Sequence, residues 1–198
     1  LVAQGGDNSP TLDTAIKSAC AGVDLDRLDV AVAYATLQGV KALTMAVGGI
    51  PPQSRWVIGL DDAISQPEAI EHLLGTAGAK VRLAKMAPAR RFHPKLYCLW
   101  SSIADDVCVS ALGSGNMTLN GMRANGETAV ILSADSVVEA NKLKKQWEDM
   151  WCLGHAPTPE EIAEYKTIYN VAKNQRKKIV DIGASPPEPE PNAPIEND

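Results

Sequence analysis

Short apolar runs rich in valine, isoleucine and leucine alternate with helical patterns over the first half of the chain, and this alternation constrains the fold more than any other feature. Apolar runs of this length, bounded by turn residues, are typical of buried strands. The predicted strands are 28–34, 56–60, 80–84, 96–100, 107–112 and 128–132. The predicted helices are 11–22, 37–47, 65–77 and 136–151. Strands in alternation with helices predict an α/β sandwich.

Three capping signals mark expected helix starts. Each has a serine or threonine followed three residues later by glutamate, so that the two side chains satisfy free backbone N–H groups of the first turn. The pairs are Ser65 with Glu68, Ser136 with Glu139, and Thr158 with Glu161. Pro159 fits the first helical position after Thr158.

The segment 96–132 departs from strict alternation, because two predicted strands follow each other across a short polar connection at 104–106. This predicts antiparallel or mixed pairing there. The length of 198 residues and the hydrophobic content of 45% fit one globular domain with an appendage. We predict a main domain at 1–154, a C-terminal helix at 155–182, and a disordered tail or linker rich in proline and glutamate at 183–198.

Charge is segregated along the chain, although the formal net charge is −5. Between positions 80 and 95 there are six basic residues and no acidic one, while 179–198 carries five acidic residues and no basic one. The acidic average therefore does not exclude nucleic acid, since affinity for phosphates depends on local lysine and arginine. The alternative for 80–95 is an ordinary solvated face.

The sequence offers no candidate membrane span, metal site or cofactor loop. The longest uncharged apolar stretch, 42–52, contains two glycines and two prolines and is much shorter than the roughly 20 residues that a membrane helix needs. The three histidines and four cysteines have no metal-ligand spacing, and the cysteines form no CxxC pair, so we expect no metal, reduced thiols and a cytoplasmic location. We also expect no cofactor, because no segment fits a dinucleotide loop.

Two polar segments lie at the ends of predicted strands. The histidine segment (92–97, Phe-His-Pro-Lys-Leu-Tyr) begins a strand with a histidine and a lysine two residues apart, so both side chains lie on one face. The asparagine segment (113–118, Gly-Ser-Gly-Asn-Met-Thr) follows another strand, and Asn-Gly-Glu at 125–127 leads into a third. The asparagine segment fits neither GxGxxG nor the GxSxG nucleophile elbow.

These residue types suit phosphoryl transfer. Lys95 and Asn116 offer donors to phosphate oxygens. His93 can attack phosphorus or move a proton, and Glu127 can hold the imidazole. Taken singly, His93 would be a structural histidine, Lys95 a surface lysine, and the glycines of the asparagine segment a simple turn.

The ordered combination of Phe-His-x-Lys, Gly-Ser-x-Asn-x-Thr-x-x-Gly and Asn-x-Glu resembles the phospholipase D superfamily. The residues of these motifs are most similar to those of the nuclease branch found in metal-independent restriction endonucleases and phage-defence proteins. The resemblance extends over about 28–151 and includes Tyr34 and Gly39. It implies a phospholipase D-like α-β-α sandwich with a mixed central sheet flanked by helices, and it makes 1–154 the catalytic domain. The catalytic residues that it implies are His93, Lys95, Ser114, Asn116 and Glu127.

One position departs from the superfamily pattern, which usually has an aspartate shortly after the lysine where this chain has Trp100. In the nuclease branch, the glutamate after the asparagine segment resembles its replacement. The resemblance therefore implies that Glu127 orients the imidazole of His93. Asp105 and Asp106 are the alternative, but they lie in a predicted turn.

By resemblance, the chemistry is a two-step displacement at phosphorus without metal, in which one histidine attacks and a second protonates the leaving oxygen. The chain has one copy of the motif and no internal repeat, so we expect a homodimer that shares one site across its two-fold axis. His72 lies inside a predicted helix and His155 at a helix end, and neither is expected to be catalytic.

The expected substrate is DNA, with RNA as an alternative, in a restriction or phage-defence system whose other proteins are expected partners. Residues predicted to contact nucleic acid are Lys85, Arg82, Arg90, Arg91 and Thr118. Two alternatives remain open at this stage. One is a phospholipid phosphodiesterase or phosphatidyl transferase, for which an apolar membrane-binding surface would be expected. The other is a non-catalytic DNA-binding or assembly subunit.

Overall fold

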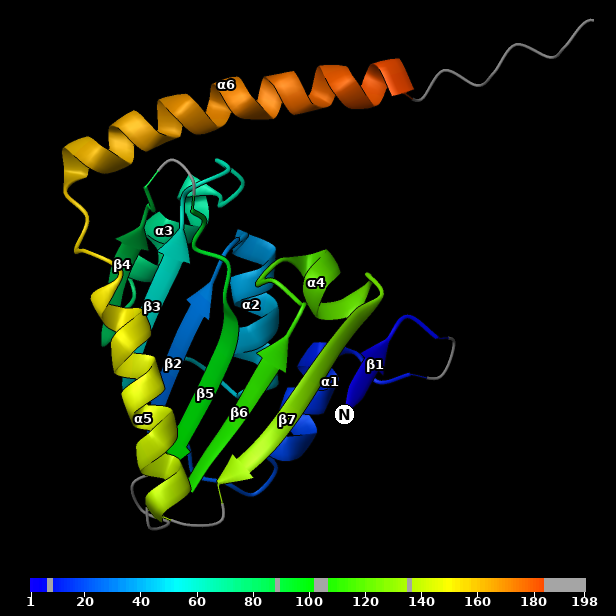
Figure 1. Cartoon of the computed structure of the whole chain (residues 1–198), viewed down its shortest axis with the longest axis vertical. Coiled ribbons are helices and arrows are strands. Elements are labelled where there is room, and N and C mark those ends of the chain that lie inside the picture. Colours follow the sequence, from blue (N-terminus) through cyan, green and yellow to red (C-terminus); the bar gives the residue numbers. More distant parts are fainter. Residues whose placement is uncertain (7–8, 88–89, 102–106, 135–136, 184–198) are drawn as a thin grey trace, which may run out of the picture.

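The computed structural model describes residues 1–6, 9–87, 90–101, 107–134 and 137–183 (Figure 1). In chain order, its elements are β1 (Val2–Gln4), α1 (Leu12–Ala19), β2 (Arg27–Val32), α2 (Leu37–Ala46), β3 (Gln53–Gly59), α3 (Pro67–Leu74), β4 (Ala79–Ala84), β5 (Lys95–Ser101), β6 (Val107–Gly113), α4 (Leu119–Arg123), β7 (Glu127–Ala134), α5 (Val137–Cys152) and α6 (Pro159–Gly183).

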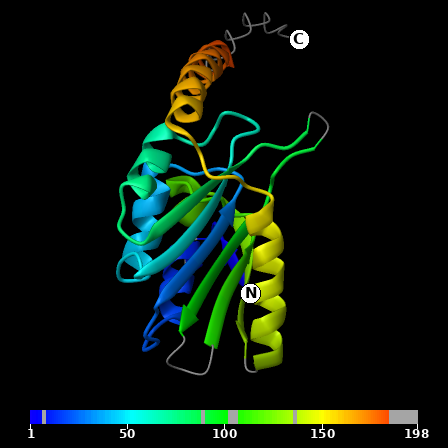
Figure 2. The ribbon, with the colours of Figure 1, turned by 90° about the vertical axis from the view of Figure 1, so that its left-hand side faces the viewer.

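The strands form one mixed sheet in the order β1-β7-β6-β5-β2-β3-β4. β2, β3 and β4 are parallel, whereas β5 is antiparallel to both β2 and β6. β7 is antiparallel to β6 and to β1. α1, α2 and α3 lie on one face and α5 lies on the other (Figure 2), which confirms the predicted sandwich with a mixed central sheet. α6 passes across the edge of the sheet at which β2, β3 and β6 end (Figure 1).

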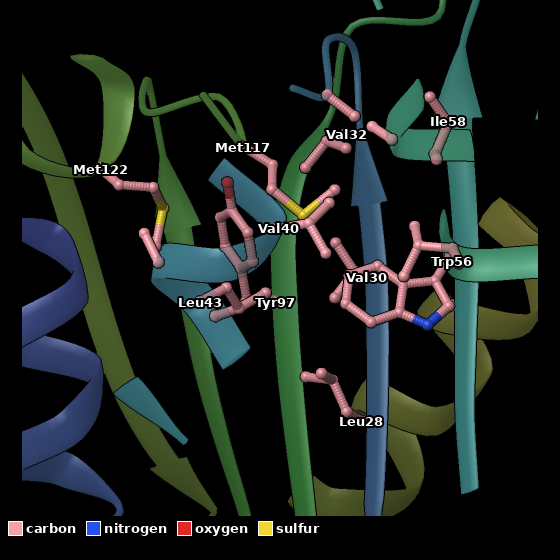
Figure 3. Packing of buried hydrophobic residues seen from close by; sticks show 14 of the residues in the cluster. Leu28, Val30, Val32, Val40, Leu43, Trp56, Ile58, Tyr97, Met117 and Met122 are labelled. Carbon is pink, nitrogen blue, oxygen red and sulfur yellow. The ribbon is translucent and has the colours of Figure 1, made fainter. Parts of the chain in front are cut away.

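The main core lies between the sheet and helices α1 to α3. Val30 and Val32 on β2 are fully buried and pack near Trp56 of β3 and Tyr97 of β5 (Figure 3). Met117, which belongs to the asparagine segment, is also fully buried in this cluster. Burying an apolar side chain of this size contributes about 2 kcal/mol. The asparagine segment is therefore fixed to the core through its methionine.

A buried carboxylate connects the other face of the sheet with α5. Asp29 on β2 is fully buried, and its carboxylate accepts hydrogen bonds from Arg55 Nε at 2.9 Å and Trp100 Nε1 at 3.0 Å. Arg27 forms a further ion pair with it. Arg55 also contacts Glu148 of α5 at 2.8 Å. Burial of this carboxylate is tolerated because charged and polar donors surround it.

Arginine–tryptophan stacking extends this contact along α5. The guanidinium of Arg55 lies 5.3 Å from the ring centroid of Trp147 and 5.4 Å from that of Trp151. Arg82 of β4 lies 4.4 Å from the ring centroid of Trp151. Each such contact adds roughly 0.5–1 kcal/mol. Together with the Asp29 ion pairs, they hold α5 against β2, β3 and β4.

All six predicted strands and all four predicted helices are present, but the capping role of Ser65 was predicted wrongly. The helix begins at Pro67, and Gln66 is its N-cap. Ser65 is buried, donates a hydrogen bond to the carbonyl of Gly59 at 2.7 Å, and accepts one from the amide of Ala35 at 3.1 Å. Buried backbone groups must be paired, and here the serine hydroxyl pairs them.

The other capping predictions have different outcomes. Thr158 accepts a hydrogen bond from the Glu161 amide at 3.2 Å, and Pro159 is the first residue of α6, so the threonine half of that capping box is confirmed. The carboxylate of Glu161 contacts His155 Nε2 at 2.7 Å. Ser136 lies outside the described residues. The sequence did not predict β1 or α4, which have three and five residues and are too short to show a periodic pattern.

Within the described ranges, no helix is long and apolar enough to cross a membrane. Cys20, Cys98 and Cys152 form no disulfide bond in the described part of the chain.

The buried ion pairs predict a large effect of removing Asp29. Asp29→Ala should lower the free energy of unfolding by about 3 kcal/mol, because two guanidinium groups lose their buried partner. Chemical denaturation measures this change. The exposed Asp24→Ala is the control and should change the value by less than about 0.5 kcal/mol. Equal effects of the two substitutions would contradict the assigned role of Asp29.

Candidate active site

Strand pairing brings the motif segments together at one edge of the sheet. β5 runs antiparallel to β6, with Leu96 opposite Leu112, so the start of β5 lies beside the end of β6. β7 pairs with β6 through Gly113 and Ala129, so its first residue, Glu127, lies at the same edge. The histidine segment, the asparagine segment and Glu127 therefore meet, although up to 35 positions separate them in the sequence.

His93 and Lys95 are in direct contact at this edge. The Nζ of Lys95 lies 2.7 Å from Nδ1 of His93, whose side chain is exposed to solvent. The Nζ of Lys95 also lies 3.2 Å from Nε2 of His93 and donates to the backbone carbonyl of His93 at 3.2 Å. Burial lowers the pKa of Lys95, and the nearby carboxylate of Glu127 opposes this shift. The pair can hold a phosphate oxygen beside a nucleophilic nitrogen.

Ser114 and Glu127 form a second contact across the ends of β6 and β7. The hydroxyl of Ser114 donates to the Glu127 carboxylate and accepts from the amide of Thr128 at 3.0 Å. Asn125 also donates to the Glu127 carboxylate, at 3.2 Å. Among the described residues, the hydrogen bonds of Glu127 go to Ser114 and Asn125 rather than to His93. The orienting role implied for Glu127 stays a prediction.

Asn116 lies between the two contacts in the chain and is half-buried. Its side-chain Oδ1 is buried and has no hydrogen-bond partner among the described residues. An unpaired buried carbonyl costs free energy. The backbone next to it is fixed, because the amide of Thr36 donates to the carbonyl of Met117 at 2.9 Å.

Two glycines allow helices to approach the asparagine segment closely. A Cβ atom on Gly39 of α2 would lie 2.1 Å from the carbonyl oxygen of Met117. A Cβ atom on Gly121 of α4 would lie 2.5 Å from the carbonyl oxygen of Asn116. Thr118 caps α4 by accepting from the Gly121 amide at 3.0 Å, which is a structural contact. Helices α2 and α4 thus hold the backbone on both sides of Asn116.

Tyr34 is a site residue to which sequence analysis gave no role. It follows β2, and its ring packs edge-to-face on the imidazole of His93, with ring centroids 5.6 Å apart. Its hydroxyl donates to the carboxylate of Asp62 at 2.6 Å. Burial and this carboxylate raise the pKa of Tyr34 to about 12. The signal in the sequence was a polar aromatic residue at the end of a strand whose residues are mostly aliphatic.

The predicted nucleic-acid contacts divide into three groups. Lys85 and Arg90 are exposed. Arg91 is exposed and forms an ion pair with Asp62. Arg82 points elsewhere: it donates to the carbonyl of Trp151 at 2.9 Å and stacks on that ring, so the structure does not bring it to the site.

A cavity of about 470 Å³ opens beside His93 and Lys95. Leu96, Leu112 and Met150 form its apolar wall. Its volume lies in the range of small-molecule sites. The described residues contain no group of three or more histidine, cysteine or acidic side chains that could hold a metal ion.

Comparison with solved structures gives the class of fold. Nuc from Salmonella typhimurium, described as a phospholipase D family member, is 21% identical with a TM-score of 0.50, covering 72% of this chain and 88% of that one. NucT from Helicobacter pylori is 18% identical with a TM-score of 0.50, covering 72% and 89%. Phosphatidylserine synthase from Haemophilus influenzae Rd KW20 is 15% identical with a TM-score of 0.52, covering 89% and 45%.

These similarities confirm the phospholipase D-like α/β fold predicted from the motifs. No protein-family model matches the sequence, and no curated protein matches it. At these identities the likeness concerns the fold, so the chemistry must be argued from the site itself.

The close approach of α2 predicts that Gly39 tolerates no side chain. Gly39→Ala should lower the free energy of unfolding by about 2–3 kcal/mol, because the new methyl group would overlap a backbone carbonyl that cannot move away. Gly75→Ala is a matched control, since a Cβ atom there has no neighbour nearer than 3.5 Å. Denaturant unfolding of both variants measures the difference, and a Gly39→Ala protein as stable as Gly75→Ala would contradict the assigned packing.

Proposed function

We propose that this chain is a metal-independent phosphodiesterase that cleaves DNA through a phosphohistidine intermediate. The observation that supports this most strongly is the contact between Lys95 Nζ and His93 Nδ1 at 2.7 Å, at the sheet edge that also carries Asn116 and Glu127. A nucleophilic nitrogen beside fixed cationic and amide groups is what displacement at phosphorus needs.

The proposed reaction has two steps. A ring nitrogen of His93 attacks phosphorus, so that an N–P bond forms as the bond to the leaving oxygen breaks. A second histidine protonates that oxygen. Water then attacks phosphorus, the N–P bond to His93 breaks, and the proton of the water returns to the second histidine. Lys95 and Asn116 stabilise the charge on the phosphate oxygens throughout.

DNA is favoured as substrate by the basic residues near the site. Lys85, Arg90 and Arg91 are all exposed and precede His93 on the connection from β4 to β5. Cationic side chains at such positions contact backbone phosphates and carry no base specificity. We place the enzyme in the cytoplasm, where it would act in restriction or phage defence together with partner proteins. The reason is that its motif sequences resemble those of proteins in such systems.

The second histidine is proposed to come from another copy of the chain. His72 lies on α3, and His155 contacts Glu161 at 2.7 Å beside the edge strand β4, so neither belongs to the motif segments at the site. His93 is therefore the single histidine that each copy contributes. A two-fold axis near His93 would complete the site.

An uncovered apolar part of the sheet lies next to the site and suits such a contact. Val130 and Leu132 on β7 are 41% and 45% exposed. Val130 pairs with Leu112, which also lines the cavity beside His93. Figure 1 shows that none of the described helices covers the front of β6 and β7 over most of its length. Exposed apolar residues on an open sheet face indicate a protein contact.

A phosphatidyl transferase is the second candidate. Two observations support it. The similarity to phosphatidylserine synthase, with a TM-score of 0.52, covers 89% of this chain. The cavity beside His93 also has an apolar wall, which could contact a lipid chain. Assays on DNA, RNA and phospholipid vesicles distinguish the candidates. Binding of DNA without turnover of any substrate would favour a non-catalytic assembly subunit instead.

His93→Ala should abolish DNA cleavage measured in EDTA, because the nucleophile is lost. We expect a rate at least about 10³-fold lower, the scale on which removal of a nucleophile acts. His72→Ala is the matched control and should cleave at the wild-type rate. Equal cleavage by wild type and His93→Ala would assign the activity to a contaminating nuclease.

The chain should be a dimer in solution, held by the open face of β6 and β7. Leu132→Glu should convert it to a monomer and abolish cleavage, because a buried charge at the interface is strongly unfavourable. Ile168→Glu on α6 is a matched control, since Ile168 is 44% exposed, and should stay dimeric. Light scattering measures the mass. A fully active wild-type monomer would contradict the shared site.

A further inference from the structure

The turn after β3 contains the one non-glycine residue in the described part of the chain with a positive φ. Ala63 has a φ of 49° and is buried. An L-residue with a Cβ atom adopts this left-handed conformation at a cost in free energy, and such strain persists only when surrounding contacts impose it. The β3 turn (61–63) is therefore held in place from outside.

The two aspartates of the β3 turn hold the surroundings of His93. The carboxylate of Asp61 accepts hydrogen bonds from the amides of Met86 at 2.9 Å and Phe92 at 2.6 Å, at the beginning and end of the connection that leads to His93. The carboxylate of Asp62 accepts from the hydroxyl of Tyr34, whose ring packs against the imidazole. A displacement of the turn would therefore move both the connection that leads to His93 and the ring of Tyr34.

Helix α6 supplies the contacts that hold the turn. Arg176 donates from Nη2 to the carbonyl of Ala63 at 2.8 Å and from Nη1 to the carbonyl of Asp62 at 3.2 Å. Nearer the start of α6, Tyr165 donates to the carbonyl of Ser65 at 2.7 Å, two residues after Ala63. Figure 1 shows α6 lying across the edge of the sheet where this turn is found.

We propose that α6 positions the nucleophile: Arg176 fixes the β3 turn, and through Asp61, Asp62 and Tyr34 the turn fixes the imidazole of His93. Arg176 is thus a positioning residue and not a phosphate contact, because its guanidinium is already bound to two carbonyl oxygens. The inference rests on the proposed function in one respect only, namely that His93 is the group whose position determines the rate.

Steady-state kinetics test this with bis-(para-nitrophenyl) phosphate in EDTA, a small diester that cannot reach along α6. Arg176→Ala should lower kcat by about tenfold or more and leave KM within about twofold, since small displacements of a reacting group reduce the rate of the chemical step. Lys177→Ala, which removes the neighbouring exposed charge, should change neither. A rise in KM alone, or equal losses in both variants, would overturn the proposal.

Proton NMR of the imidazole rings gives a second test that does not need activity. The chain has three histidines, so His72 and His155 serve as internal references and His93→Ala identifies the third signal. Arg176→Ala should shift the His93 signal by more than its linewidth, because the edge-to-face contact with Tyr34 changes, while the other two stay. Lys177→Ala should shift none. A stationary His93 signal in Arg176→Ala, or equal shifts of all three, would contradict the inference. Absence of His93-dependent hydrolysis in wild type would instead refute the proposed function.

Discussion

The antiparallel pairing of β5 with both β2 and β6 is the constraint on which the rest of the site depends. Because β5 runs against its neighbours, its first residues lie beside the last residues of β6 and not at the opposite edge of the sheet. Lys95 is the first residue of β5 and pairs with Val32, at the end of β2. A parallel β5 would place the histidine segment far from the asparagine segment.

Contacts of different kinds then fix each part of this edge. The asparagine segment is held by backbone approach, since Gly39 and Gly121 leave no room for a side chain and Met117 is buried in the core. The histidine segment is held by carboxylates, through Asp61 and Asp62. Rigid support of this kind is what a preorganised site requires. Two local features cost free energy, which the rest of the fold offsets. They are the strain at the β3 turn and the buried Oδ1 of Asn116, which has no hydrogen-bond partner in the described part of the chain.

Local patterns were sufficient to predict the long strands and the α/β sandwich, because these are encoded in consecutive residues. The segments that meet at the site were predicted from their resemblance to the phospholipase D superfamily. Contacts between distant residues were not predictable in this way. Ser65 has the spacing of a helix cap but binds buried backbone groups, and Arg82 belongs to a basic run but stacks on a tryptophan of α5. Tyr34 and Arg176 both contact Asp62, which lies 28 and 114 positions away from them in the sequence. No periodicity or propensity contains such information.

The central claim is that the imidazole of His93 attacks phosphorus. The most direct measurement is peptide mapping by mass spectrometry after the enzyme is quenched at alkaline pH during turnover of bis-(para-nitrophenyl) phosphate, since a histidine N–P bond is labile in acid. The account predicts a para-nitrophenyl phosphoryl group on the peptide that carries His93, at that residue. Turnover with His93 unmodified, or with the group on another residue, would contradict it.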